Sequence, residues 1–311
     1  MSQIKSKPSV SIGLPVYNGQ EYLRGSIDSL LAQDFQDFEL IISDNASTDA
    51  TAAICREYCA SDRRIRYCRN DRNIGASRNF NRVFELARGD LFKWASHDDE
   101  CHPRLLSRCI ETLQSAPPAV VLVYPQSELI DAAGKTIGRF ECRLDLREKR
   151  PHQRLAHLFK TINLTNPLFG IIKTSFLRRT RLEDWFPASD HVLLAELAML
   201  GEIWEVPEVL FRRRLHDQRF LAGKPSQEAV ANWNDPAGRR NRPLLPRWER
   251  MIYESLRSVC RSPLCAREKF LCFLAVPFAH YSRHLRNGGG RCKAQLARLV
   301  TRGTAFTGPP Q

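Results

Sequence analysis

Short apolar runs alternate with helical patterns along the first 125 residues of the chain. Between the runs, apolar residues such as Leu23, Ile27 and Leu30 recur every three or four positions, which indicates amphipathic helices. Alternation of this kind is typical of an α/β sheet with crossover helices. The strands predicted for this sheet are Val10–Leu14, Phe38–Ser43, Ile65–Cys68, Leu91–Ala95 and Val120–Tyr124.

The pattern is more mixed after residue 130. Phe169–Ile172 and Val209–Arg212 predict strands and Val192–Leu200 predicts a helix, so we interpret this region as the second half of the same domain. The stretch Lys224–Pro246 is rich in Pro, Gly and Asn and predicts a linker. The expected units are a domain over residues 1–225 with halves 1–125 and 126–225, a linker over 226–246, and a C-terminal helical extension over 247–311.

Helical patterns continue beyond the predicted linker. Met251 and Val259 fall on the apolar face of an amphipathic helix. The apolar run Phe270–Phe278 is too short to span a bilayer and is broken by Pro277, so it predicts a buried or interfacial helix. A basic amphipathic segment follows Gly288–Gly290.

The positive charge of the chain is concentrated in this extension. The net charge is +13, and from Leu245 onward 12 Lys or Arg residues face 3 Glu residues, which leaves +4 for everything before. No RNA-binding motif, zinc finger or helix-turn-helix pattern accompanies the charge, so we expect no nucleic-acid partner. Two alternatives stay open: peripheral contact with an anionic membrane, and simple packing of the extension on the domain with its Arg residues solvated.

The first residues of the chain and its cysteines indicate the cellular compartment. Met1–Pro8 is polar, and Val10–Leu14 is too short for the core of a signal peptide. The ten cysteines form no CxxC pair and no zinc-finger spacing. The sequence therefore predicts a cytoplasmic protein, peripheral on the inner face of the membrane if the basic extension docks there.

Polar clusters follow three of the predicted strands. They are Pro15–Gly19 after the first strand, Asp44–Asp49 after the second and Ser96–Glu100 after the fourth. Open parallel sheets bind ligands at the carboxyl ends of their strands. These clusters therefore predict a binding site at one edge of the sheet.

The acidic pair Asp98 and Asp99 suits a nucleotide diphosphate. One carboxylate can bind a ribose hydroxyl, and the other can bind a divalent cation that bridges phosphate oxygens. The alternative is a helix start, because Pro103 follows and acidic residues favour a first turn. Asp44 directly follows a strand and is placed to accept hydrogen bonds from a nucleobase edge, whereas Asp49 is expected to cap the next helix.

Two further side chains complete the candidate donor site. Tyr17 can stack on a base, and Arg78 follows the turn that begins at Asn73 and can reach the base or the phosphates. Taken singly, each of these residues is more often a surface or packing residue.

Four stretches together resemble glycosyltransferase family 2, which has the GT-A fold. They are Ile12–Asn18, DNASTD from Asp44, NIGASRN from Asn73 and HDDE from His97, and the resemblance covers about the first 225 residues. It implies a Rossmann-like, mixed nucleotide-binding sheet flanked by helices, with a nucleotide-sugar half at 1–125 and an acceptor half at 126–225. It further implies nucleotide-sugar contacts by Pro15, Tyr17, Asn18, Asp44, Asn73, Arg78 and Asp98.

The resemblance also implies catalytic and metal residues. Family members carry the catalytic base in an acidic motif at a helix start, and Asp190 matches it, with Ser189 where Glu is commoner. Glu183 and Asp184 are competing candidates for the base. Asp99 and His216, the latter in an Arg-x-His element, would bind Mn²⁺ or Mg²⁺.

The expected activity is inverting, metal-dependent transfer of a sugar, most commonly from a UDP-sugar in this family, to a hydroxyl of a glycan or lipid-linked acceptor. Such a reaction serves polysaccharide or glycoconjugate biosynthesis. Arg247 and Trp248 are present, but Leu244 stands where the QxxRW motif of processive members begins, so a single addition is favoured. The alternative is a catalytically inactive nucleotide-sugar-binding or scaffold protein.

Overall fold

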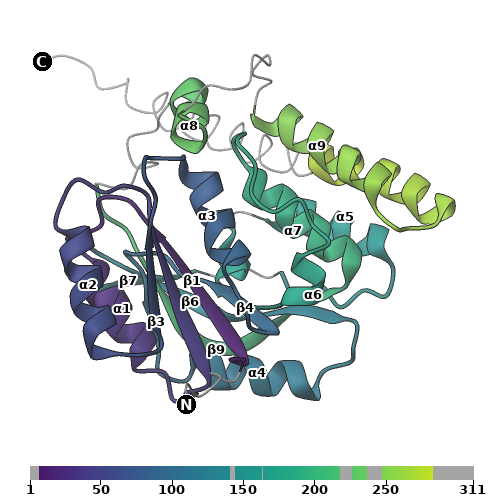
Figure 1. Ribbon diagram of the computed structural model, residues 1–311. Coiled ribbons are helices and arrows are strands. Elements are labelled where there is room, and N and C mark those ends of the chain that lie inside the picture. The colour runs from purple at the N-terminus through teal and green to yellow at the C-terminus, as the bar shows by residue number, and fades with distance from the viewer. Residues whose placement is uncertain (1–6, 141–143, 163, 218–225, 237–246, 283–311) are drawn as a thin grey trace, which may run out of the picture.

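The computed structural model describes residues 7–140, 144–162, 164–217, 226–236 and 247–282. Its centre is a mixed sheet of nine strands in the order β3-β2-β1-β4-β8-β6-β9-β5, with β7 paired to β6 (Figure 1). The strands are β1 Val10–Val16, β2 Phe38–Asp44, β3 Ile65–Arg69, β4 Leu91–Trp94, β5 Glu100–Cys101, β6 Val120–Ile130, β7 Thr136–Phe140, β8 Ile171–Lys173 and β9 Glu202–Arg214.

Helices cover both faces of the sheet. The α/β architecture predicted from the sequence is therefore confirmed, and β1 to β4 are the parallel strands expected from its apolar runs. The helices are α1 Leu23–Leu31, α2 Thr51–Ser61, α3 Ala76–Glu85, α4 Leu105–Ser115, α5 Pro151–Thr161, α6 Thr174–Leu177, α7 Ser189–Leu200, α8 Gln227–Asn234 and α9 Arg247–Arg261, with a 3-10 turn η1 at Asn166–Phe169.

Two apolar layers hold the helices to the sheet. On one side, Ile12 and Leu14 of β1 belong to the same buried cluster as residues of α1 and α4. On the other side, Phe92 and Trp94 of β4 join a cluster that includes residues of α3, α5, α7 and α9. Strands buried on both faces carry continuous apolar runs, which is why the sequence predicts their positions closely.

The second half of the sheet departs from the prediction. The strand expected at Phe169–Ile172 is displaced, because Pro167 starts the 3-10 turn and β8 begins only at Ile171. Strands β6 and β9 are longer than expected and pair in parallel, with register shifts around Pro125 and between Val206 and Val209. Proline lacks an amide donor, so these bulges let both strands continue past it.

The expected linker contains structure in its described part. Helix α8 forms within it, and Ser226 caps α8 by accepting a hydrogen bond from the amide of Ala229 at 3.1 Å. The last residue of α8 lies against the start of α3: a Cβ added to Gly75, whose φ is +89°, would come within 2.1 Å of the Asn234 carbonyl oxygen. The predicted linker is therefore partly a helix packed on the domain.

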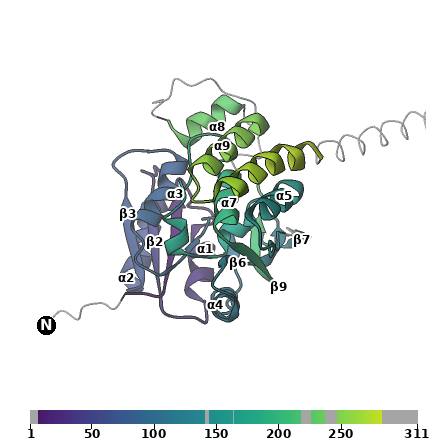
Figure 2. The ribbon, with the colours of Figure 1, turned by 90° about the vertical axis from the view of Figure 1, so that its right-hand side faces the viewer.

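Two helices of the C-terminal extension also pack on the domain. Figure 2 shows α9 running across α7, and residues 266–282 form a further helix. Arg181 joins the two parts by ion pairs to Glu196 of α7 at 2.8 Å and to Glu254 of α9 at 2.9 Å. Within the described residues, no helix combines the length and apolar character that crossing a bilayer requires. The basic segment predicted after Gly288 lies outside them.

Candidate functional site

The loops after β1 and β2 are tied to each other. Asn18, which has a φ of +49°, donates its amide to the Ser47 hydroxyl at 2.9 Å, and its side-chain oxygen accepts from the amide of Thr48 at 2.9 Å. Pro15 is buried in β1 beside Ser43 of β2, whereas the Tyr17 side chain is 43% exposed. Pro15 and Asn18 thus help to fix the loop that carries the exposed Tyr17.

Asp44 is fully buried and bound by its own protein. Its Oδ1 accepts from the Ser47 amide at 2.8 Å, and its Oδ2 accepts from the Tyr67 hydroxyl at 2.7 Å and from Arg69 Nη1 at 2.9 Å. Burial, and then the hydrogen bond to Asp44, raise the pKa of the Tyr67 hydroxyl, so this hydroxyl stays protonated. The Arg69 side chain is 42% exposed and is the member of the cluster that a nucleobase would meet.

Sequence reasoning missed Tyr67 and Arg69. Both lie on β3, and the strand register places Arg69 directly beside Asp44. The usable signal was the alternation of Tyr67 and Arg69 at the end of this strand, because alternate residues of a strand share one face.

Asn73 and Arg78 flank the start of α3. The Asn73 side-chain oxygen accepts from Asn45 Nδ2 at 2.8 Å and from the amide of Gly75 at 2.9 Å, which fixes the turn against the loop after β2. Arg78 is half-exposed, and its Nη2 lies 3.9 Å from Asp235 Oδ1 at the end of α8. The predicted linker thus approaches the candidate donor site through Arg78.

The end of β9 holds the acidic loop after β4. The Arg214 amide donates to Asp99 Oδ1 at 2.9 Å, and Arg214 Nε donates to the Asp98 carbonyl at 2.9 Å. His216 Nε2 lies 3.1 Å from Asp98 Oδ2, and its ring packs 4.6 Å from the ring of Tyr22. The structure therefore brings His216 against Asp98, the aspartate expected to contact the nucleotide sugar, and places Tyr22 beside them.

The side chains of this loop can be compared with those that bind a divalent cation. Among the residues that the structure describes, no group of three or more His, Cys, Asp or Glu side chains is arranged to hold a metal ion. A Mg²⁺-like cation commonly takes one or two protein carboxylates and completes its coordination with substrate phosphates and water. Asp99 fits that pattern, and Nδ1 of His216, which is buried and has no hydrogen-bond partner, would be the nitrogen ligand.

Asp190 is the second residue of α7 and is partly open to solvent. Its side chain is 36% exposed. The Thr165 hydroxyl donates to its Oδ2 at 2.8 Å, and Nδ1 of the buried His191 lies 2.8 Å from its Oδ1. A carboxylate oriented by two partners and still reachable from solvent can accept a proton from a bound hydroxyl group.

Glu183, a competing candidate, lies beside the helix start that carries Asp190. It accepts a hydrogen bond from the Ser189 hydroxyl, and its backbone amide donates to Asn81 Oδ1 of α3 at 3.0 Å. Loss of hydration on burial, and then the negative charge of Asp190, raise the pKa of Glu183 to about 8. A carboxyl group that keeps its proton at neutral pH is the poorer general base of the two.

A chain of contacts joins Asp190 to the acidic loop. Thr165 binds Asp190, and its neighbour Asn166 accepts a hydrogen bond from Arg213 of β9. The next residue, Arg214, binds both Asp98 and Asp99. The candidate base and the candidate metal loop therefore share one network, although they come from opposite halves of the domain.

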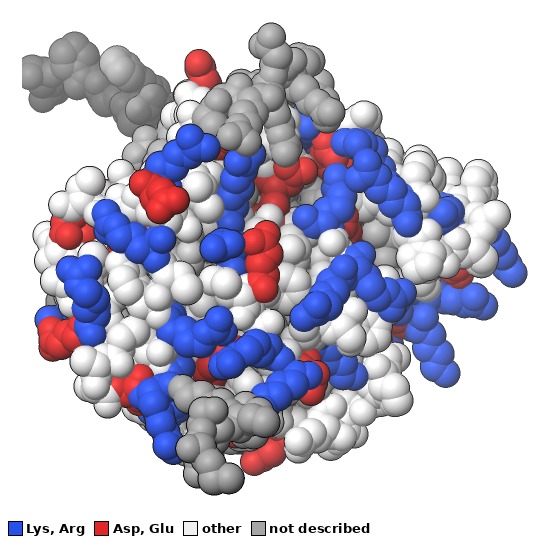
Figure 3. Space-filling view, in the orientation of Figure 1, with Lys and Arg blue, Asp and Glu red and all other residues white. Residues whose placement is uncertain are grey.

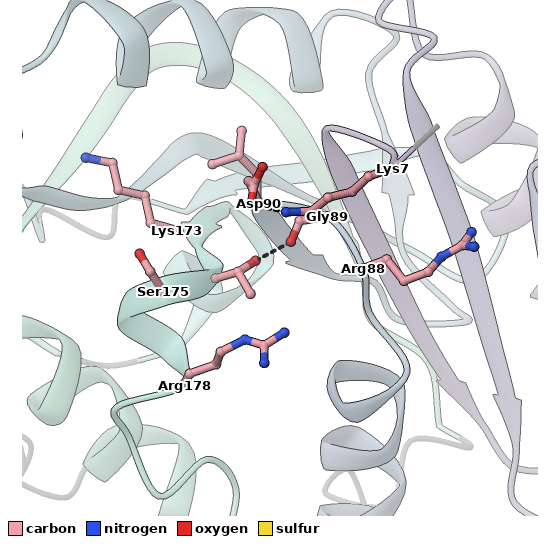
Figure 4. Close-up of a pocket in the computed structure, with 9 residues that line it drawn as sticks. Lys7, Arg88, Gly89, Asp90, Lys173, Ser175 and Arg178 are labelled. Carbon is pink, nitrogen blue, oxygen red and sulfur yellow. Dashed lines mark hydrogen bonds and ion pairs between the residues drawn. The ribbon is translucent and has the colours of Figure 1, made fainter. Parts of the chain in front are cut away.

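A cavity of about 460 Å³ lies away from this network. Figure 4 shows it beside the turn at Gly89 and Asp90, which precedes β4, with Lys173 and Arg178 on its other side. This is the end of the sheet at which β1 and β4 begin, whereas the candidate site follows their carboxyl ends. Lys7, which also lines the cavity, already pairs with Asp90. None of the predicted site residues lines this cavity.

Comparison with protein families and curated proteins identifies the family of this chain. The family model for glycosyl transferase family 2 matches residues 11–183. An uncharacterised glycosyltransferase of Rickettsia typhi is 28% identical over 219 residues, covering 70% of this chain and 67% of the relative. A GalNAc(5)-diNAcBac-PP-undecaprenol beta-1,3-glucosyltransferase of Campylobacter jejuni is 28% identical over 192 residues, covering 61% and 60%. The first five relatives are matched over 18% to 67% of their lengths.

Solved structures give the same answer for the fold. Residues 1–349 of TarS of S. aureus in complex with UDP-GlcNAc superpose with a TM-score of 0.63 at 15% identity, over 88% of this chain and 73% of that TarS chain. The mannosyltransferase PcManGT of Pyrobaculum calidifontis, in complex with GDP-Man and Mn²⁺, superposes with a TM-score of 0.56 at 16% identity, over 97% and 81%. At these identities the likeness shows a shared fold.

Proposed function

The chain belongs to glycosyltransferase family 2 and has the GT-A fold, and on that premise we propose that it transfers a sugar from a UDP-sugar to a hydroxyl group of a glycan or lipid-linked acceptor with inversion. The TarS complex with UDP-GlcNAc supports the choice of nucleotide. The name of the Campylobacter jejuni relative, which includes an undecaprenol diphosphate, supports a lipid-linked acceptor. The observation that carries the proposal is the network that connects Asp98 and Asp99 with Asp190.

We assign donor binding to the loops after β1, β2 and β4. Tyr17 stacks on the base, and Arg69 offers its guanidinium to the base edge while Asp44 holds Arg69 in place. Arg78 reaches the phosphates, and Asp98 binds the ribose or the phosphate side of the donor. Pro15, Asn18 and Asn73 give these loops their shape.

Asp190 acts as the general base in this proposal. It takes the proton of the acceptor hydroxyl as the hydroxyl oxygen bonds to the anomeric carbon. Attack comes from the face opposite the diphosphate, whose bond to that carbon breaks, so the configuration inverts. Thr165 and His191 orient the carboxylate, and its solvent-exposed side leaves room for the acceptor.

Asp99 and His216 are the residues that would hold Mn²⁺ or Mg²⁺, beside Asp98. Such a cation, when bound, neutralises charge that develops on the leaving diphosphate. The chain itself prepares the loop, because Arg214 fixes both aspartates through its amide and guanidinium. His216 is held between Asp98 and Tyr22, which sets the direction of its ring.

Donor binding and product configuration together test the proposal. Thermal unfolding is measured with UDP-, dTDP- and GDP-sugars, each with and without Mn²⁺ or Mg²⁺, because a ligand of the native state raises the Tm. We expect a UDP-sugar with metal to give the largest rise, and NMR of the product from an α-linked donor to show a β-linkage. A larger rise with a GDP-sugar would refute the nucleotide assignment. Donor binding without release of UDP, in the presence or absence of acceptor, would indicate an inactive binding protein.

A further inference from the structure

The helix over residues 266–282 has two faces of opposite character. Its inner face is anchored on the domain: Glu268 pairs with Arg150 at 3.2 Å and with His152 at 2.9 Å, both of α5. Cys272 and Val276, one and two turns further along, are fully buried. The helix is therefore fixed to the catalytic domain along one side.

The outer face carries large apolar side chains that face solvent, and we call it the aromatic face. Its members recur every three or four residues, so they lie on one side of the helix. Their exposed fractions are far above those of the inner face. They are Phe270 at 62%, Phe273 at 38%, Leu274 at 56%, Phe278 at 67% and Tyr281 at 64%.

Among the described residues, two exposed arginines lie close to the aromatic face. Arg267 is exposed one turn before the aromatic face, and Arg261 is exposed at the end of α9. After Glu268 the sequence contains seven Lys or Arg residues and no Asp or Glu. Basic side chains also dominate the charged surface at the right-hand edge of Figure 3, where α9 lies.

We propose that the aromatic face is a docking surface for an anionic lipid bilayer, which holds the catalytic domain at the membrane. Aromatic and leucine side chains enter the boundary between headgroups and acyl chains, while neighbouring cations attract anionic headgroups. A second copy of this chain would instead bring its own exposed Arg267 to the same face, where like charges repel. The inference depends on the proposed function in one respect: docking at the membrane would give the enzyme access to a lipid-linked acceptor.

Vesicle co-sedimentation of the full chain tests the proposal. The probes are vesicles of phosphatidylcholine alone and of phosphatidylcholine mixed with phosphatidylglycerol, each at low and high salt. We expect binding to the anionic vesicles, weakened by salt. The triple variant Phe270→Gln, Leu274→Gln, Phe278→Gln should bind at least ~100-fold more weakly, because three large apolar side chains would no longer be buried in the bilayer.

A matched control separates the aromatic face from exposed apolar residues in general. Ile137 of β7 is 53% exposed and lies on another element, so Ile137→Gln should bind vesicles as wild type does, whereas Phe278→Gln alone should lose ~10-fold. All variants should keep the Tm and the donor-induced Tm rise of the wild type, because the changed side chains face solvent. Loss of donor binding therefore bears on the proposed function, and loss of vesicle binding bears on this inference.

Several outcomes would overturn the inference. Wild-type protein that ignores anionic vesicles at low salt would do so, as would equal binding of the triple variant. Equal binding to vesicles of phosphatidylcholine alone would remove the anionic surface from the proposal. A wild-type dimer that becomes monomeric in the triple variant, measured by sedimentation velocity without lipid, would show that a second copy covers the face.

Discussion

The first two loops of the donor half and the acidic loop after β4 are held in place by contacts of different sequence range. Asn18 and Ser47, which join the first two loops, are 29 residues apart, and Asp44 and Tyr67 are 23 apart on neighbouring parallel strands. Asp98 and His216 are 118 residues apart, and Asp99 and Arg214 are 115 apart. The loops after β1 and β2 are therefore held by contacts within successive strand–helix units, whereas the acidic loop after β4 is held by β9, from the other half of the domain.

The comparison teaches that changes in the two regions should have separable effects. A change at the donor loops should alter affinity for the nucleotide sugar, and a change at Asp190 should alter turnover alone. The experiments below test this separation, from the largest expected effect to the smallest.

The sharpest separation is expected for Asp190→Asn. It removes the proton acceptor but keeps the size and the hydrogen-bonding oxygen, so turnover should fall by about 10² to 10⁴. Donor affinity, measured by the Tm rise with a UDP-sugar, should be unchanged. Glu183→Gln is the matched control, because Glu183 is already protonated at neutral pH and should keep most of the activity. Full turnover in Asp190→Asn would refute the role of this residue as base.

Substitutions in the acidic loop and at His216 should weaken donor binding that depends on the metal. Asp98→Asn, Asp99→Asn and His216→Ala should each weaken metal-dependent donor binding by at least the ~10–100-fold that losing even a supporting partner of a metal ligand costs. Titration of Mn²⁺ at fixed UDP-sugar, with a chelator as reference, measures the effect. The variant with the largest loss identifies the principal ligand, and unchanged metal dependence in all three would exclude this loop as the metal site.

Glu183 should make stability depend on pH. Its pKa is raised from 4.5 to about 8, so the folded protein keeps a proton that the unfolded chain has lost between these values. The free energy of unfolding should therefore fall as the pH rises from about 4.5 to 8, by up to ~1.4 kcal/mol per pH unit. Urea unfolding at several pH values should show this slope in the wild type and a flatter profile in Glu183→Gln. Equal slopes would show that Glu183 has an ordinary pKa.

The smallest effect is expected at Tyr67. Tyr67→Phe removes one of three hydrogen bonds to the buried Asp44 carboxylate and should cost about 1–2 kcal/mol of stability. Donor affinity should fall only slightly, because Arg69 still binds Asp44. Urea unfolding and donor-induced Tm rises measure the two quantities. A loss of donor affinity as large as that of Arg69→Ala would place Tyr67 in the binding site itself.

The sequence alone predicts the donor half well for a local reason. Strands β1, β2 and β4 are short and largely apolar, and the polar residues of the site directly follow each of them. Prediction from local pattern fails where prolines interrupt strands or where a helix has the composition of a linker. Pro125 and the prolines at 167 and 207 conceal the true extents of β6, β8 and β9, and the composition of 226–246 conceals α8.

Amino-acid sequence by itself determined the order of the strands and helices of the first half, the polar clusters at the strand ends and the family to which the chain belongs. Only the tertiary structure decided that His216 contacts Asp98 and that Tyr67 and Arg69 donate hydrogen bonds to Asp44. It also placed Glu183 beside the start of α7. The physical reason is the sequence separation between residues that contact each other. Hydrophobic periodicity records which face of an element is buried, whereas a side chain's partner, and hence its charge and pKa, depends on strands and loops that can lie more than a hundred residues away.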